Sequence, residues 1–244
     1  MKKIIVTLAF VIMTNAIFAQ MIMSIKKTDN STVNMWVSDI TEITFVDFIC
    51  GITTVTYSGQ TYNTVLIGSQ CWLKENLNVG TKIISDGSHT GFQQTNNSII
   101  EKYCYNNDEA NCDIYGGLYE WTEAMQYATT PGAQGICPSD WHIPTYAEYD
   151  TLRSYASQAA KLVAIGQPAT LYTPTNETGF SALFAGFRTR DTGTFGNLGY
   201  GAYFWGSTQF SATLGNCFYL LQDYRYTLHV LSSYQDNSVR CLRD

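Results

Sequence analysis

Charged residues, histidine and proline are scarce in this sequence of 244 residues. Asp, Glu, Lys and Arg together make up 14 %, and the chain has three histidines and five prolines. The cysteines include no C-x-x-C pair and the histidines are scattered, so a zinc site is not indicated. Acidic residues outnumber basic ones by 20 to 14, which argues against a nucleic-acid surface. After residue 19 no apolar run reaches about 18 residues, so the sequence predicts no membrane span.

The first residues are typical of a secretory signal peptide. Lys2 and Lys3 form a basic start, residues 4–18 are largely apolar, and Ala19 is a suitable cleavage position. Removing residues 1–19 takes two of the 14 basic residues and no acidic one, leaving 12 against 20, or about -8. No cysteine stands at the cleavage position, so lipid attachment is not indicated. We expect a secreted protein, located outside the cell or in its envelope.

Seven cysteines in an exported chain favour disulfide bonds over a metal site. Seven choices of the unpaired cysteine, each with 15 pairings of the other six, allow about a hundred arrangements. Cys104 and Cys112 bracket a short turn-rich stretch, and Cys50 and Cys71 flank a segment with its own turn at Ser58 and Gly59. Cys217 is then left over, either as a small buried hydrophobic residue or as a reactive thiol. The remaining pair, Cys137 and Cys241, would tie the ends of one domain together.

Two regions follow the expected signal peptide. Residues 20–49 contain short β-rich runs at 21–25, 33–37 and 42–48, which predict a β-hairpin-like segment or spacer. Residues 50–244 form the main domain, where runs at 55–57 and 62–67 predict a β-hairpin.

Two helices are expected in this main domain. Leu118, Trp121 and Met125 have helical spacing and predict a helix over 117–127. Thr145 and Glu148 form a capping box for a second helix, which we expect to break near Ser157 and resume to Val163. After residue 181, aromatic residues alternate with Gly, Ser and Thr, as in strands joined by long loops.

Six motifs in order give the chain a specific resemblance. They are YNTVLIGSQCWLKENL at 62–77, YGGLYEW at 115–121, CPSDWHIPT at 137–145, GFSAL at 179–183, FWGST at 204–208 and SVRC at 238–241. Together these motifs resemble the Fibrobacter succinogenes major paralogous domain, a family of exported bacterial proteins, over roughly residues 53–244. The resemblance supports a Cys137–Cys241 clasp, because both cysteines lie inside family-like motifs.

The resemblance implies an α+β fold. The family is similar in layout to C-type lectin-like domains and to the formylglycine-generating sulfatase-modifying fold. We therefore expect two helices, small twisted antiparallel sheets, long loops and disulfides, preceded by a short N-terminal β segment. The triplets that bind calcium in sugar-binding lectin domains are absent, as is the C-x4-C copper pair of formylglycine-generating enzymes. No general activity comes with the family.

Two groups of residues are candidates for a ligand site. Asp108, Asn111 and Asp113 belong to a cysteine-bracketed loop rich in oxygen ligands, which suits calcium, although Asn and Asp are also ordinary turn formers. The segment 188–216 combines polar and aromatic side chains that suit contacts with sugars or peptides. Arg188 and Tyr203 can equally be core supports. The expected contact residues are Arg190, Asp191, Phe195 and Tyr200.

Three hypotheses for function follow from these features. The first is an exported, non-catalytic binding or adhesion module of the bacterial surface, with a glycan or protein ligand and no cofactor other than calcium. The second is a divergent oxidoreductase of the formylglycine-generating type. The third is a structural stalk or matrix component.

The remaining motif residues are expected to be structural. The four motif tryptophans should lie in the core, namely Trp72, Trp121, Trp141 and Trp205. His142 is expected to form structural hydrogen bonds.

Overall fold

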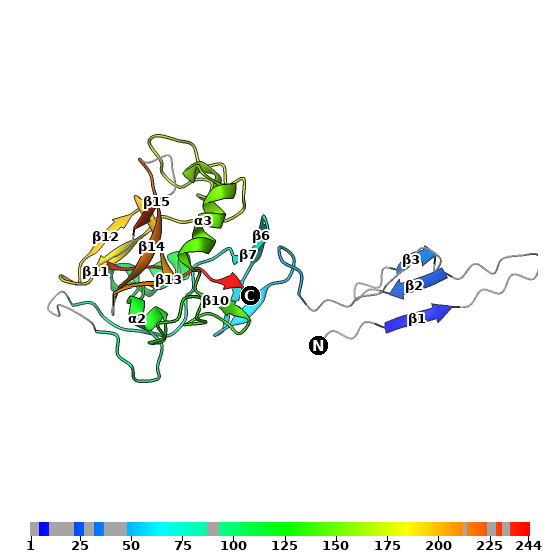
Figure 1. Cartoon of the computed structure of the whole chain (residues 1–244), viewed down its shortest axis with the longest axis horizontal. Helices are drawn as coiled ribbons and strands as arrows, with labels where there is room; N and C mark the ends of the chain where they lie inside the picture. Colours follow the sequence, from blue (N-terminus) through cyan, green and yellow to red (C-terminus); the bar gives the residue numbers. More distant parts are fainter. Residues whose placement is uncertain are drawn as a thin grey trace, which may run out of the picture. The chain divides into compact units, whose positions relative to one another are not determined.

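The computed structural model describes residues 5–9, 22–26, 32–36, 48–86, 93–211, 214–223, 228–230 and 235–244. The chain divides into two compact units, Met1–Asp47 and Phe48–Asp244. Figure 1 shows the elements of both units in chain order.

The first unit is a small antiparallel sheet. Strand β1 (Ile5–Ala9) pairs with β2 (Ile22–Lys26), which pairs with β3 (Thr32–Trp36). Strands β2 and β3 match two of the three runs expected in this region to within one residue. Residues 42–47 of the third run lie outside the described residues. Strand β1 lies within the segment expected to be a signal peptide, whose cleavage stays a prediction.

The second unit begins with the hairpin that Ser58 and Gly59 predict. Strand β4 (Val55–Tyr57) pairs with β5 (Gln60–Tyr62) across that turn. Strand β6 (Thr64–Ile67) then pairs with β7 (Gln70–Leu73), so the predicted 62–67 run is divided between two strands. Strand β17 (Leu242–Arg243) lies between β7 and β10 (Trp141–His142), which places the end of the chain inside a four-stranded sheet.

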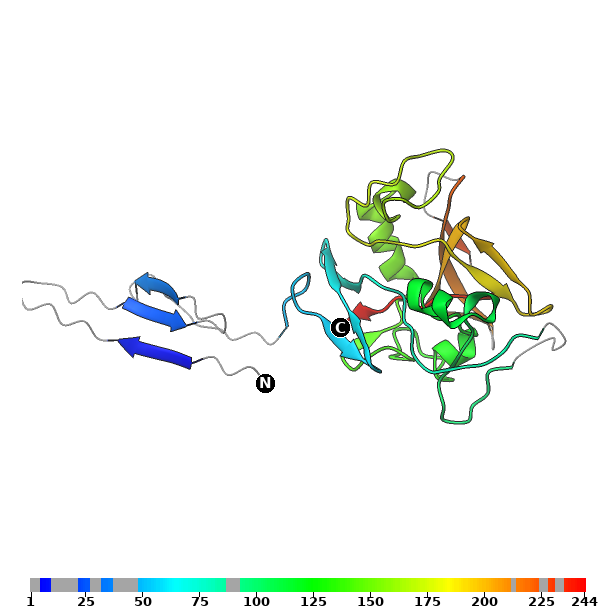
Figure 2. The ribbon, with the colours of Figure 1, turned by 180° about the vertical axis from the view of Figure 1, so that it is seen from behind.

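Two three-stranded sheets form the second half of this unit. In the first sheet β11 (Ala185–Thr189) is the central strand, with β12 (Phe195–Leu198) on one side and β16 (Gln235–Asp236) on the other. In the second sheet β14 (Leu214–Leu221) is central, between β13 (Gly201–Ser211) and β15 (Leu228–Val230). A short parallel pair joins β8 (Thr81–Lys82) and β9 (Glu101–Lys102). In Figures 1 and 2 the β13–β14 pair lies between α3 and the β11–β12 hairpin.

The helices are short and differ partly from expectation. Helix α3 (Tyr146–Tyr155) begins at Thr145 with the predicted capping box, and a 3-10 turn at Ala159–Lys161 follows the predicted break. The helix expected over 117–127 contracts to α2 (Trp121–Ala124), because Leu118 forms a β-bridge with Tyr103 before it, and Gln126 and Tyr127 after it have positive φ angles. Helix α1 (Glu109–Tyr115), which follows a 3-10 turn at Tyr105–Asn107, was not expected from the turn-rich composition there.

The core of the second unit is aromatic and tied by disulfides. Trp72, Trp121, Trp141 and Trp205 are at most 3 % exposed, which confirms their assignment to the core. The disulfides link Cys50 to Cys71, Cys104 to Cys112 and Cys137 to Cys241, as the sequence and its family resemblance indicated. Cys217 is free and buried.

The architecture is therefore mixed α and β, with few helices, small and mainly antiparallel sheets, and three disulfides. None of the helices within the described ranges is long and apolar enough to cross a membrane.

Candidate functional site

A network of buried charges fastens the β11–β12 hairpin to the core. Arg188 of β11 donates from Nη1 to Oδ2 of Asp236 in β16 at 2.6 Å, and both side chains are fully buried. The guanidinium also donates to Ser85 Oγ at 2.7 Å and Gln93 Oε1 at 3.0 Å, and it lies 4.1 Å from the ring centre of Tyr103. A buried guanidinium with this many partners is a structural anchor. Arg188 is therefore a core support, one of the two roles that its sequence position allowed.

Glu120, directly before α2, adds a second buried carboxylate to this network. Its Oε1 accepts hydrogen bonds from the backbone N–H groups of Gln93 and Gln94, at 2.7 and 3.2 Å. Burial and the carboxylate of Asp236 raise the pKa of Glu120 to about 7. Burial also raises the pKa of Asp236, to about 6, although Arg188 attracts its charge. Burial therefore disfavours the charged form of both carboxyl groups.

Arg190 belongs to the interior rather than to a ligand surface. It is 4 % exposed, and its charge lowers the pKa values of both Glu120 and Asp236. The sequence suggested a surface contact because Arg190 stands in a loop-like stretch beside Gly, Thr and Asp. Its two carboxylate neighbours come from distant parts of the chain, so no local pattern indicates their proximity. A role of Arg190 in direct ligand contact stays a prediction, and this burial does not favour it.

Asp191, Phe195 and Tyr200, also predicted as ligand contacts, lie on or near the surface. Asp191 is exposed in the turn after β11. The half-buried Phe195 has its ring centre 5.2 Å from that of Tyr105, and Tyr200 donates a hydrogen bond to Asp223 Oδ2 at 2.6 Å. Phe195 thus fastens the hairpin to the Cys104–Cys112 loop, whereas Tyr200 is held at the end of β14. The structure places Asp191 and Phe195 in the β11–β12 hairpin and Tyr200 in the turn between β12 and β13, without joining their side chains.

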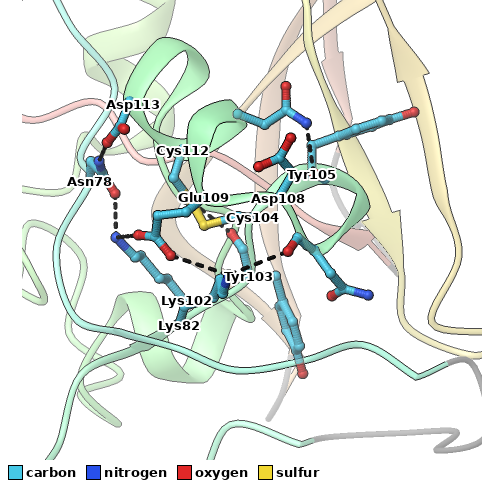
Figure 3. The surroundings of a disulfide bond; sticks show 12 residues. Asn78, Lys82, Lys102, Tyr103, Cys104, Tyr105, Asp108, Glu109, Cys112 and Asp113 are labelled. Carbon is cyan, nitrogen blue, oxygen red and sulfur yellow. Dashed lines mark hydrogen bonds and ion pairs between the residues drawn. A yellow bond between two sulfur atoms is a disulfide. The ribbon is translucent and has the colours of Figure 1, made fainter.

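The three residues expected to suit calcium have separate roles around α1. Asp108 caps this helix by accepting from the N–H of Ala110 at 3.1 Å, and Asn111 donates to the carbonyl oxygen of Tyr105 at 2.9 Å. Asp113 points toward Asn78, on the other side of the Cys104–Cys112 disulfide from Asp108 (Figure 3). Within the described ranges, no group of three His, Cys, Asp or Glu side chains is arranged to hold a metal ion. Calcium binding here stays untested, and the geometry does not bring the three side chains together.

An open polar pocket of about 380 Å³ lies beside this disulfide. Its lining comes from strand β5, the segment after β7, helix α1 and the segment before β11, and comprises Gln60, Thr61, Tyr62, Lys74, Glu75, Asn76, Asn78, Cys112, Asp113, Ile114, Gly116, Ser181 and Leu183. The lining residues therefore come from four segments that are separate in the sequence, and the pocket volume lies within the range of small-ligand sites.

Hydrogen bonds hold the walls of this pocket in place. Asn76 donates to the carbonyl oxygen of Tyr115 at 2.8 Å and accepts from the buried Arg240 at 2.6 and 3.1 Å. Asn78 accepts from Lys102 Nζ at 2.5 Å and donates to Asp113 Oδ1 at 3.5 Å (Figure 3). These bonds join the segment after β7 to α1, which positions two walls of the pocket relative to each other.

A close backbone approach at Gly116 completes that wall. Gly116 has a φ of +81°, and an added Cβ would stand 2.6 Å from the Cβ of Asn76. Only glycine adopts this conformation readily and permits this approach. The glycine therefore allows the end of α1 to pack directly on the segment after β7.

The sequence did not indicate this pocket as a site. Lys74, Glu75 and Asn76 belong to one family-like motif and Ser181 to another, yet Gln60 and Asp113 lie outside the six motifs. The Cys104–Cys112 pairing and the hairpin turn at Gly59 were the signals available. Neither indicates that the hairpin, α1 and the segment at 181–183 surround one cavity.

Comparison with known proteins identifies the family and nothing closer. A family model described as the Fibrobacter succinogenes major domain matches residues 65–243. No curated protein and no solved structure matches the chain. The matched span includes the disulfide clasp, Arg188, Glu120, Asp236 and much of the pocket lining. The chain therefore belongs to the Fibrobacter succinogenes major domain family, as the six motifs indicated.

Proposed function

We propose that this protein is an exported, non-catalytic binding or adhesion module of the bacterial surface or envelope, with a glycan or protein ligand. The observation that carries this proposal is the open pocket of about 380 Å³, whose polar walls are fixed by a disulfide and by buried hydrogen bonds. A pocket that keeps its shape without ligand reduces the ordering cost of binding. The proposal includes export by the N-terminal signal peptide and a C-type lectin-like arrangement of the main domain.

The cysteines favour binding over copper-dependent oxidation. Six of the seven are joined in disulfides, which leaves Cys217 as the free one. Burial raises the pKa of its thiol to about 12. A protonated and buried thiol is a poor nucleophile and a poor metal ligand. The seven cysteines therefore provide no accessible pair of thiolates for copper.

A comparison of two variants on glycan and surface-protein arrays tests the proposal. The first variant alters the pocket (Thr61→Val with Lys74→Met), and the second, the hairpin variant, alters the turn of the β11–β12 hairpin and the turn that follows it (Asp191→Ala with Tyr200→Phe). We expect the parent protein to show saturable binding that the pocket variant loses and the hairpin variant keeps. Binding lost only in the hairpin variant would move the site to the segment predicted from the sequence. A parent protein without any saturable ligand would favour the stalk or matrix hypothesis instead.

A further inference from the structure

The polar groups of the pocket divide into two sets. Asn76, Asn78 and Glu75 are engaged in the wall, since Glu75 accepts from the N–H and the Nδ2 of Asn63 at 2.7 and 2.8 Å. In contrast, three polar groups of the lining have no hydrogen-bond or ion-pair partner among the described residues. They are Lys74 Nζ, the Gln60 amide and the Thr61 hydroxyl. These three side chains are the groups available to a ligand.

Tyr62 adds a hydroxyl at the edge of the buried region. Its side chain is 2 % exposed, and its oxygen accepts the N–H of Asn78 at 3.0 Å. Within the described part of the chain it has no acceptor for its own proton. The raised pKa of Tyr62, about 12 and caused mainly by burial, keeps that proton in place at neutral pH. A buried hydroxyl whose proton has no acceptor favours a ligand with an acceptor oxygen.

The charges of the lining select against an anionic ligand. Lys74 is its one cation, whereas Glu75 and Asp113 are carboxylates, so the lining is net negative. The protein as a whole has a formal charge of -6. Donors at Lys74 and Tyr62 line the same pocket as the carboxylate acceptor of Asp113, a mixture that matches hydroxyl groups, which both donate and accept.

Apolar contact is also available beside these polar groups. Ile114 is 59 % exposed, and the half-buried Leu183 lines the pocket with it. Aliphatic side chains cover C–H surface without adding charge. A sugar ring offers both kinds of surface, with hydroxyls at its edge and C–H groups on its faces.

We propose that this pocket binds one unit of a neutral saccharide, with Gln60, Thr61, Lys74 and Tyr62 as hydrogen-bonding residues and Ile114 and Leu183 as apolar contacts. This inference rests on the proposed binding function and names its ligand class. The volume of the pocket lies at the lower end of the range for small-ligand sites, which suits a short segment of a longer chain.

The test is an NMR titration of the full 15N-labelled chain. The probes are neutral trisaccharides of glucose, mannose and galactose, the corresponding uronic-acid trisaccharides, and a neutral tripeptide. We expect at least one neutral trisaccharide to produce saturable shifts of the amides of Thr61, Lys74 and Asp113. The uronic-acid probes should bind more weakly because of the carboxylates of Glu75 and Asp113.

Two variants and a matched control locate the interaction. Lys74→Met keeps the aliphatic stem and should weaken the binding about tenfold or more, because hydrogen bonds to charged groups are the stronger ones. Thr61→Val is nearly isosteric and should weaken it severalfold. Lys161→Met, which removes an ammonium that pairs with Glu177 outside this pocket, should leave the affinity unchanged.

Several outcomes overturn the saccharide proposal. They are an absence of saturable shifts with every neutral trisaccharide, tighter binding of the uronic-acid probes, and binding that neither pocket variant weakens. A tripeptide that alone binds at these amides would overturn the ligand class and leave the proposed binding function in place. Failure of the binding function itself would appear on the arrays as a parent protein without any saturable ligand.

Discussion

At the scale of single residues, the buried pair Glu120 and Asp236 makes stability depend on pH. The pKa of Glu120 is raised to about 7 from an ordinary value of 4.5. The contribution of Glu120 to the unfolding free energy is therefore fully present below about pH 4.5 and is lost as the pH rises through about 7. Near it, Asp236 repels the Glu120 charge and Arg190 attracts it.

Glu120→Gln should remove this dependence. The variant keeps an oxygen for the N–H groups of Gln93 and Gln94 and carries no charge. We expect it to gain about 1–3 kcal/mol in unfolding free energy relative to the parent at pH 8, with little difference at pH 4. Urea unfolding from pH 4 to 8 measures this, with the exposed Glu177→Gln as control. Parallel stability curves for parent and variant would contradict it.

Arg188→Met should be strongly destabilising. The change leaves Asp236 buried without its ion pair, which typically costs about 3–5 kcal/mol. The double variant Arg188→Met with Asp236→Leu should recover much of this loss, because the apolar pair has no charge to desolvate. Chemical denaturation of both variants tests the point, and equal losses in the single and double variants would show that the charge pairing is not the cause.

Single residues also show why part of the site was beyond prediction. The core tryptophans and the free, buried Cys217 were anticipated because residue type alone favours burial at these positions. Arg190 was placed on the surface because its sequence neighbours are small and polar. The carboxylates that make its burial tolerable, Glu120 and Asp236, stand about seventy and fifty residues away along the chain.

At the scale of elements, His142 joins β10, α3 and the end of the chain. Its Nε2 lies 3.0 Å from Glu148 Oε1, and its Nδ1 lies 2.5 Å from Asp244 Oδ1. Burial lowers the pKa of His142, but the hydrogen bonds and charges of these two carboxylates outweigh burial and raise it. The expectation of a histidine with structural hydrogen bonds is confirmed.

His142→Gln should reveal this contribution through its pH dependence. Because the pKa of His142 is raised, its stabilisation is complete below the ordinary value of 6.5 and is lost as the pH rises through the folded-state value. We expect the variant to lower the melting temperature more at pH 5.5 than at pH 8.5. Thermal unfolding followed by circular dichroism measures this. An equal loss at both pH values would mean that His142 acts only through packing.

Elements with local signals were the ones predicted from the sequence. Thr145 and Glu148 mark the start of α3 because a capping box involves residues three positions apart. Helix α1 was missed because its Asn and Asp residues are equally typical of turns, and Asp108 functions as its cap. The pocket was missed for a different reason, since β5, α1 and the segment before β11 meet only in the folded domain.

At the scale of the whole molecule, the Cys137–Cys241 disulfide should dominate covalent stabilisation. It joins residues 104 positions apart, whereas Cys104 and Cys112 are separated by 8. In the chain-entropy model a loop of the first size contributes about 4–5 kcal/mol and one of the second size about 2–3 kcal/mol.

The corresponding double variants test this difference. We expect Cys137→Ala with Cys241→Ala to lose more unfolding free energy than Cys104→Ala with Cys112→Ala, in urea titrations under identical conditions. A larger loss from the short loop would show that native packing, rather than restriction of the unfolded chain, sets the contribution of these bonds.

The same long disulfide also limits how far the protein stretches under mechanical load. The 104-residue span between Cys137 and Cys241 cannot extend when the chain is pulled from its ends, which withholds about 360 Å of contour length at roughly 3.5 Å per residue. A single-molecule pulling trace should therefore lengthen by about that amount once a reductant opens the bond. Such a domain would act as a short tether that resists extension over this span even after its sheets have separated.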